Sequence, residues 1–292
     1  MTDQPRFEPS GRPPAEDAIL SSGPPRATAF IVTIYGDAVA PRGGVLSMRS
    51  LIEVGAVHGL SESLVRTAVS RLVAAGRLVG ERVGRTSFYR LTEAAETEFA
   101  AAARVLYDPP APASGWLLAM TDALPGEGWA QIATGLCVAP DRSDIARPDA
   151  LTFASEVIAG AAQMPDFAAA HWPLGAVAEA YRDFLDRFAP LAADPAMLGA
   201  VPPEAALALR LRLVHAFRAA ALADPRLPAP ALPGDWPGGP ARAAFVTAYL
   251  ALADAADAEI ARRFEDARGP LPQETARTQA RLQRLRRESI TH

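Results

Sequence analysis

The sequence predicts a mixed, mainly α fold with an N-terminal winged helix-turn-helix, a small central α/β region and a C-terminal helical domain. Three observations predict it. A helix followed at once by a basic hairpin occupies residues 61–91, a Pro-rich break follows at 108–115, and long amphipathic helical patterns begin at about residue 171. At 292 residues, the chain is long enough for two or three domains with cores of their own.

The first 25 residues contain six prolines together with Gly and Ser, and we expect a flexible arm there. The winged-helix domain is assigned to residues 27–107. Its first helix is predicted from the apolar run Ala29 to Gly36, and Ser47 is expected to cap a second helix over Met48 to Val57. His58-Gly59-Leu60 then forms the short turn that a helix-turn-helix requires.

The next helix begins at Ser61, a good N-cap, with Glu62 in the first turn, where the helix dipole favours an acid. Gly76 is its expected C-terminal stop. Helical spacing predicts an apolar face that consists of Leu64, Val65, Ala68, Val69, Leu72 and Val73. The opposite face carries Ser63, Arg66, Thr67, Ser70, Arg71 and Ala74, which suit a DNA major groove. A solvated surface helix remains the alternative for this segment taken alone.

The hairpin that follows favours the DNA-binding interpretation of this helix. Residues 77–83 and 86–91 are short β-rich runs, and Gly84-Arg85 joins them as a tight turn. A basic hairpin of this kind can lie along a phosphate backbone or enter a minor groove. Residues 41–90 carry eight arginines against three acids, a net charge of +5, whereas the whole chain is −4. The expected DNA contacts are Arg42, Ser47, Ser63, Arg66, Thr67, Ser70, Arg71, Arg82 and Arg85.

A further Ala-rich helix over Glu93 to Tyr107 closes this domain, and residues 108–115 form a linker. Strands are predicted at Trp116 to Met120 and Gln131 to Val138, within a small α/β domain assigned to residues 114–170. The stretch Thr121 to Ala130 between them leaves little room for a crossover helix.

The helical domain is assigned to residues 171–270, with helices predicted over Leu174 to Phe188, Glu204 to Ala223 and Arg242 to Phe264. Within the last of these, Ala243 to Ala261 suits either a dimer interface or an internal core. Residues 271–292 are expected to be a basic C-terminal tail, an exposed helix or a frayed end, with a second DNA contact as the less favoured alternative.

No catalytic set is found, so we expect no enzymatic activity, no cofactor and no metal site. The four histidines have no ligand spacing, and Walker, nucleophile-elbow and dinucleotide motifs are absent. The single cysteine, Cys137, is expected to be a buried small side chain and fits a reducing compartment. Without a signal peptide or membrane span, the expected location is the cytoplasm.

The segment that begins TAFIVTIYGDAVAPRGG and runs through SESLVRTAVSRLVAAGRLVGERVGRTSFYRLT resembles the N-terminal domain of PaaX-like transcriptional repressors, regulators of phenylacetic acid catabolism. His171 to Leu191 and Leu211 to Gly238 also resemble later segments of this family, and the resemblance covers about residues 27–260. It implies a central ferredoxin-like region, here expected to be trimmed or rearranged, and an aryl-CoA thioester such as phenylacetyl-CoA as the effector.

Such an effector needs aromatic side chains for its acyl group and cations for its phosphates. The candidate effector residues are Trp172, Tyr181, Arg182, His215, Arg218 and Trp236. Helically spaced aromatics are more often core residues, which is the competing interpretation. We expect a homodimer on a two-fold-related, double-stranded operator. Two alternatives remain open: a winged helix used for protein contacts, and a nucleic-acid-processing enzyme.

Overall fold

The computed structural model describes residues 14–291, and the first half of the predicted arm lies outside that range. Within the described part, Pro14–Leu20 forms helix α1. Ile19 of α1 is buried and belongs to the main hydrophobic core. The prediction of a flexible arm is therefore wrong for residues 14–20, because an apolar side chain docks this segment on the body of the protein.

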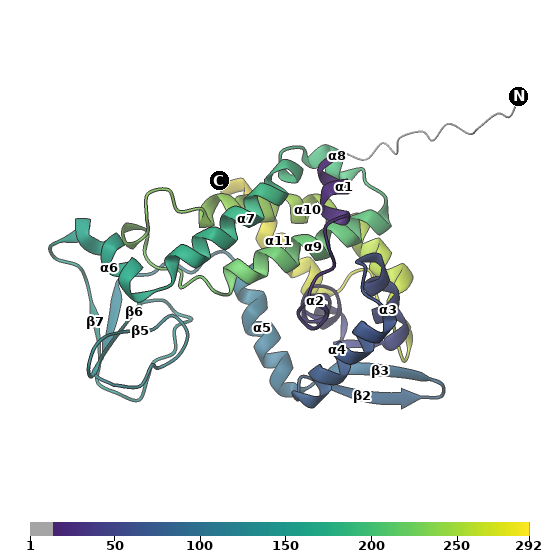
Figure 1. Cartoon of the computed structure of the whole chain (residues 1–292), viewed down its shortest axis with the longest axis horizontal. Helices are drawn as coiled ribbons and strands as arrows, with labels where there is room; N and C mark the ends of the chain where they lie inside the picture. Colours follow the sequence, from purple (N-terminus) through teal and green to yellow (C-terminus); the bar gives the residue numbers. More distant parts are fainter. Residues whose placement is uncertain (1–13, 292) are drawn as a thin grey trace, which may run out of the picture.

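The predicted helices and hairpin of the winged helix are present in the expected order. They are α2 (Ala27–Ile34), α3 (Met48–Val57), α4 (Glu62–Ala74), β2 (Leu78–Val83), β3 (Thr86–Leu91) and α5 (Glu93–Tyr107). A short strand that was not predicted, β1 (Val45–Ser47), precedes α3. The strands form an antiparallel sheet in the order β1-β3-β2. Figure 1 shows the β2–β3 hairpin projecting beside α4.

Local signals explain these boundaries. The hydroxyl oxygens of Ser47 and Ser61 accept hydrogen bonds from the backbone N–H groups of Ser50 and Leu64, at 3.1 and 3.4 Å. Each bond satisfies one of the free donors at a helix start. Gly84 has φ of 61°, a left-handed conformation that the tight turn between β2 and β3 requires.

A π-helical turn, Tyr35–Val39, continues α2 and is followed by a 3₁₀ turn, Ala40–Arg42. The wider turn changes which side chains face inward, and Asp37 becomes almost fully buried beneath the C-terminal helices. The sequence gives no periodic signal for this irregularity.

The central region is a four-stranded antiparallel sheet in the order β5-β6-β4-β7, formed by Trp116–Ala119 (β4), Ala130–Ala133 (β5), Leu136–Pro140 (β6) and Thr152–Ser155 (β7). The single strand expected over Gln131 to Val138 is instead a hairpin that turns at Gly135, where φ is 74°. The strand order matches a split βαβ sheet, but the connections 120–129 and 141–151 contain no helix.

After β7 come a 3₁₀ turn (Ala161–Gln163) and α6 (Met164–His171), which packs beside the sheet. The C-terminal region then contains α7 (Leu174–Ala192), α8 (Pro195–Gly199), α9 (Pro203–Ala221), a 3₁₀ turn (Ala229–Ala231), α10 (Gly238–Arg263) and α11 (Ala276–Thr291). The two-residue strands β8 (Glu265–Asp266) and β9 (Gly269–Pro270) separate α10 from α11. The three predicted long helices are confirmed.

Helix α10 contacts α7, α8, α9 and α11 and supplies much of the core, including Phe245 and Tyr249. The stretch proposed as either a dimer helix or an internal core is therefore an internal core. Helix α11 corrects a second expectation: Arg281, Leu285 and Glu288 are buried, so residues 276–291 are a packed helix rather than a solvated tail.

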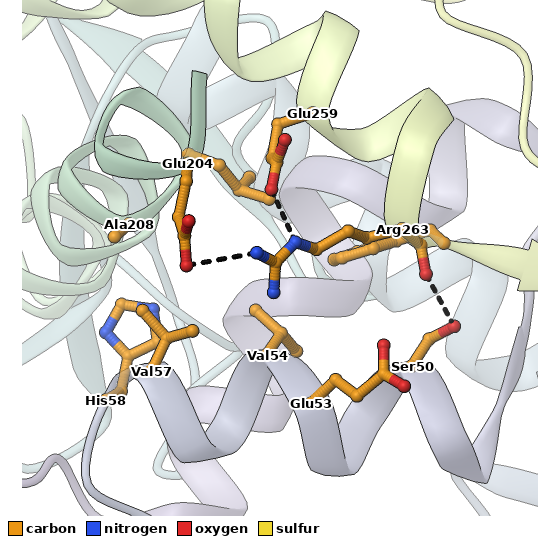
Figure 2. A pocket seen from close by; sticks show the side chains of 11 residues that line it. Ser50, Glu53, Val54, Val57, His58, Glu204, Ala208, Glu259 and Arg263 are labelled. Carbon is orange, nitrogen blue, oxygen red and sulfur yellow. Dashed lines mark hydrogen bonds and ion pairs between the residues drawn. The ribbon is translucent and has the colours of Figure 1, made fainter. Parts of the chain in front are cut away.

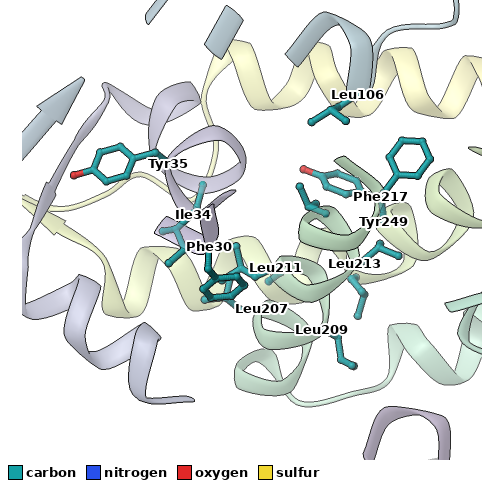
Figure 3. Close-up of a cluster of buried hydrophobic side chains, with 14 of the residues drawn as sticks. Phe30, Ile34, Tyr35, Leu106, Leu207, Leu209, Leu211, Leu213, Phe217 and Tyr249 are labelled. Atoms are coloured by element: carbon teal, nitrogen blue, oxygen red, sulfur yellow. The ribbon is translucent and has the colours of Figure 1, made fainter. Parts of the chain in front are cut away.

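The winged helix and the helical region share one hydrophobic core. Phe30 and Ile34 of α2 and Leu106 of α5 belong to the same buried cluster as Leu211 of α9 and Tyr249 of α10 (Figure 3). The domain boundary predicted near residue 107 therefore does not separate two hydrophobic cores.

Candidate nucleic-acid interface

The predicted recognition residues of α4 lie on one exposed stripe. Its members are three, four, seven and eight positions apart, which places them on one side of a helix. Val65, Ala68, Val69 and Leu72 hold the opposite side of α4 against α2 and α3. The exposed stripe consists of Ser63, Arg66, Thr67, Ser70 and Arg71.

The apolar face of α4 is narrower than the sequence indicates. Leu64 and Val73 were predicted on that face but are 50% and 38% exposed. They flank the buried stripe, where neither α2 nor α3 reaches them. An apolar side chain on a groove-facing helix can contact the methyl group of thymine, so Leu64 adds an apolar contact to the polar ones that the exposed stripe offers.

Arg66 is held loosely in place. Its guanidinium lies 2.7 Å from the carboxylate of Glu62 one turn earlier, and the two side chains are 56% and 60% exposed. An exposed pair of this kind contributes little free energy, so Arg66 can exchange Glu62 for a phosphate or a base. Arg71 makes no ion pair with any described residue.

The hairpin supplies further exposed cations. Arg82 and Arg85 are exposed at its tip, where Nε of Arg82 donates to the carbonyl oxygen of Gly84 at 3.3 Å. Arg90 of β3 and Arg49 in the first turn of α3 are also exposed. Neither was among the expected contacts, although their charge counts toward the basic segment.

Two predicted DNA contacts are wrong because their side chains are buried. Ser47 is fully buried as the cap of α3. Arg42 is buried against the C-terminal region: Nε donates to the carbonyl oxygen of Pro272 at 2.9 Å, and its guanidinium lies 2.8 Å from Asp257. Arg42 therefore joins two parts of the protein rather than contacting a phosphate.

Arg42 belongs to a buried network centred on Asp37. Tyr107 and Tyr249 each donate to Oδ1 of Asp37 at 2.9 Å, and Nε of Arg210 donates to Oδ2 at 2.9 Å. Arg281 of α11 adds an ion pair at 3.2 Å. Burial alone would raise the pKa of Asp37, but Arg210 and Arg281 hold it below its usual value. The charged network ties the π-helical turn after α2 to α9, α10 and α11.

A second connection lies between α3 and the helical region (Figure 2). Ser50 donates to the carbonyl oxygen of Arg263 at 3.0 Å, and the Arg263 guanidinium pairs with Glu204 at 3.0 Å and with Glu259 at 2.5 Å. The cavity between these residues measures about 20 Å³, which is room for about one water molecule. It is an interdomain contact and not a ligand site.

The six predicted effector residues do not form one site. His215 and Arg218 attach α9 to α2: Nδ1 of His215 lies 2.9 Å from Oγ1 of Thr33, and Arg218 donates to the carbonyl oxygen of Ala29 at 3.3 Å. Burial, together with the cations Arg218, Arg212 and Arg187, lowers the pKa of His215 to about 4.

Trp172 is also structural. It is buried beside Trp116 in the small core under the central sheet, and its Nε1 donates to the carbonyl oxygen of Gly128 at 3.1 Å. Arg182 is exposed on α7 and lies 3.6 Å from Asp235. Only Tyr181 and Trp236, from the predicted set, line a common large cavity.

Helix, turn, helix and basic hairpin, with an exposed polar stripe on the second helix, define the class of winged-helix DNA-binding regulators. Comparison with known proteins then gives the family. Residues 26–95 match the family described as PaaX-like protein, and residues 172–262 match the PaaX-like protein C-terminal domain. The chain belongs to the PaaX-like family of transcriptional repressors.

A curated relative is the transcriptional repressor PaaX of Escherichia coli strain K12, which is 31% identical over 291 residues. That match covers 87% of this chain and 89% of the relative. A solved structure, uncharacterized protein Rv0674 from Mycobacterium tuberculosis, is 22% identical with a TM-score of 0.49, covering 80% of this chain and 97% of that one.

Membership of a repressor family confirms the prediction that the protein is a regulator and not an enzyme. Among residues 14–291, no three or more His, Cys, Asp or Glu side chains are grouped so that they could hold a metal ion. None of the helices described is long and apolar enough to cross a bilayer.

Proposed function

We propose that the protein represses transcription by binding a specific operator through α4 and the β2–β3 hairpin. The observation that carries this proposal is the exposed stripe of α4, which combines two arginines with three hydroxyl groups while the other side of the helix is fixed in the core. Rigid support of such a stripe is what base readout requires, because each hydrogen bond depends on position.

In this proposal each residue has a separate task. Arg66 and Arg71 contact guanine edges or phosphates, and Ser63, Thr67 and Ser70 donate to or accept from neighbouring groups. Arg82 and Arg85 hold the backbone or the minor groove beside the site. A homodimer places two such surfaces on the two halves of a two-fold-related operator.

The proposed regulated genes are those of an aromatic-acid catabolic pathway of the phenylacetate type. The repressor acts in the cytoplasm, and an aryl-CoA thioester releases it from the operator. The support is membership of the PaaX-like family together with the resemblance of residues 171–191 and 211–238. Release requires that the effector binds the DNA-free form more tightly than the operator complex.

The test is a gel-shift assay on the DNA upstream of the protein's own gene and its neighbours, with and without phenylacetyl-CoA. We expect a specific complex that disappears when the thioester is added. A complex that ignores phenylacetyl-CoA would overturn the proposed effector and leave the repressor. Absence of any salt-dependent DNA binding would instead favour a protein-interaction module.

A further inference from the structure

A cavity of about 780 Å³ lies where the end of α5, the Pro-rich linker, α9 and the Pro/Gly loop before α10 meet. Its volume is in the range of small-molecule sites. Tyr181 from α7 and Phe217 from α9 line one part, and Trp236 lines it from the loop. The residues therefore come from segments that are far apart in the sequence.

The apolar part of the lining suits a flat group. The ring centre of Tyr181 lies 6.2 Å from that of Trp236 and 6.3 Å from that of Phe217. These are the separations of aromatic rings in contact, so the three rings form one continuous wall against which a flat acyl group can pack. The rest of the apolar wall combines Val105, Leu227 and several alanines with six prolines: Pro109, Pro110, Pro112, Pro228, Pro230 and Pro240.

The polar part of the lining favours an anion, because its acids are already engaged. Asp108 lies 2.6 Å from Arg284, and Glu288 lies 2.7 Å from Arg242. Asp224 accepts from the hydroxyl of Tyr181 at 2.9 Å and from the backbone N–H of Arg226 at 2.7 Å. A ligand therefore meets two carboxylates that are paired with arginines and a third, that of Asp224, that already accepts two hydrogen bonds.

Two of the three arginines that line the cavity, Arg226 and Arg104, retain free donors, whereas Arg242 is fully engaged with Glu288 and with backbone carbonyl groups. Arg226 has φ of 51°, a left-handed backbone that is unusual for a residue with a side chain, and its Nε is buried without a hydrogen-bond partner. Its terminal nitrogen pairs with Asp144 at 2.6 Å. Arg104 of α5 is exposed in the lining and makes no ion pair with any described residue.

We propose that this cavity is the regulatory ligand site and binds a small aryl or acyl anion, either a free acid or its CoA thioester. The flat group packs on Tyr181 and Trp236, and the anionic group lies toward Arg226 and Arg104. The regulatory meaning of the site rests on the proposed function, whereas binding itself does not.

The walls of the cavity connect directly to the DNA-binding unit. Arg242 donates to the carbonyl oxygen of Leu106, and to that of Asp108 at 3.0 Å, at the C-terminal end of α5. Helix α5 begins two residues after the hairpin strand β3 ends. A ligand that displaces Arg242 or the linker therefore acts on the helix that leads to the hairpin.

The test is isothermal titration calorimetry on the full-length protein without DNA, using phenylacetate, phenylacetyl-CoA and CoA as probes. Ala229→Trp places a large ring in the cavity, and Ala223→Trp is the matched control, since Ala223 is exposed and does not line the cavity. We expect at least one of the first two probes to bind, with affinity at least tenfold weaker in Ala229→Trp and unchanged in the control.

A second variant, Arg226→Asn, removes the cation but keeps a residue that tolerates a left-handed backbone. We expect at least a tenfold loss of affinity for the same probe. Binding of phenylacetate alone identifies the free acid, and binding of the thioester alone identifies the CoA ester. The proposal is overturned if neither binds, if the thioester binds but free CoA binds as tightly, or if both variants bind like the wild type. Loss of operator binding would contradict the proposed function without affecting this result.

Discussion

At the scale of single residues, the arginines of this chain fall into two groups. Arg66 and Arg71 are exposed on α4, where each can reach a charged partner outside the protein. Arg42 and Arg210 are buried and neutralised by Asp37 and Asp257. The two groups should differ in what their removal changes. Removing an exposed arginine weakens DNA binding, whereas removing a buried one leaves an unpaired carboxylate in the core and destabilises the fold.

We therefore predict opposite phenotypes for Arg71→Ala and Arg42→Ala. Arg71→Ala should weaken operator binding by about 1–3 kcal/mol and leave the free energy of unfolding unchanged. Arg42→Ala should lower the free energy of unfolding by about 3–5 kcal/mol. Fluorescence anisotropy with an operator fragment and urea denaturation measure the two effects. Unchanged operator affinity in Arg71→Ala and Arg66→Ala would show that the assigned recognition face is wrong.

Two histidines between α2, α3 and α9 give a prediction about pH. Burial, Arg212 and His215 lower the pKa of His58 to about 3, and that of His215 is about 4. Both are neutral in the folded state at pH 5, whereas an unfolded histidine with a pKa of about 6.5 binds a proton there. Stability is therefore complete above about pH 6.5 and decreases as the pH falls toward the folded values.

In His215→Gln, the loss of unfolding free energy between pH 7.5 and pH 5.0 should be smaller than in the wild type by about 1–2 kcal/mol. Urea denaturation at the two pH values measures it. Glutamine keeps a hydrogen-bonding group near Thr33 but cannot be protonated in this range. Equal losses in the two proteins would show that His215 does not carry the pH dependence.

At the scale of elements, α4 and the β2–β3 hairpin form the surface available to DNA, whereas α11 holds the structure behind it. The hairpin reaches beyond the body beside α4 (Figure 1). Helix α11 brings Arg281 to Asp37 and Glu288 to Arg242, so it fixes both α2 and the end of α5. The β2–β3 hairpin and α11 are both rich in arginine, but the hairpin arginines are exposed whereas Arg281 of α11 is buried against Asp37.

Replacing both Arg82 and Arg85 with alanine should weaken DNA binding uniformly across sequences. It should also reduce the slope of the logarithm of the binding constant against the logarithm of salt concentration by about 2. Arg286→Ala is the control, because Arg286 is exposed on α11, a helix that lies apart from the hairpin (Figure 1). A reduced slope in the control as well would place α11 at the DNA.

Ending the chain after residue 275 should destabilise the whole protein by at least about 3 kcal/mol, because Asp37 and Arg242 each lose a buried partner of opposite charge. Thermal unfolding followed by circular dichroism measures the change. A chain that lacks only residues 290–292 is the control, since Ile290 is 85% exposed. Equal stability of the two shortened chains would contradict the structural role of α11.

At the scale of the whole molecule, the hydrophobic core of the winged helix is continuous with that of the C-terminal helices. Phe30, Tyr35 and Tyr107 are buried in a cluster that extends through α9 and α10 (Figure 3). The central sheet has separate small cores around Trp116 and Cys137. A change in the helical region can therefore reach the DNA-binding surface without a flexible linker between the two.

A fragment of residues 26–107 should not unfold cooperatively on its own, because it exposes Phe30 and Tyr107 and leaves Asp37 without Arg210. In the full chain, amides of α2 and α9 should exchange with deuterium at similar rates, as parts of one cooperative unit. A fragment with a sharp thermal transition, or α2 amides that exchange much faster, would show that the winged helix is independent.

The helices and hairpin of the winged helix and the three long C-terminal helices can be predicted from local sequence alone. Capping serines, turn glycines and apolar periodicity act over a few residues, so Ser61, Gly84 and the spacing of Val65 and Leu72 suffice to define those elements. The exposed stripe of α4 is predictable in the same way, since a helix with one apolar side must turn its other side to solvent.

Which charged side chains are buried, and which segments share a core, depends on how the elements pack together. Arg42 and Arg66 look alike in a sequence, but the π-helical turn at Tyr35–Val39 and the docking of α10 and α11 cover the first and leave the second free. The cavity arises in the same way, because Tyr181, Arg226 and Trp236 meet only when the linker and the Pro/Gly loop pack together. Pairings between residues far apart in the chain leave no periodic signal, and they determine burial and the ligand cavity.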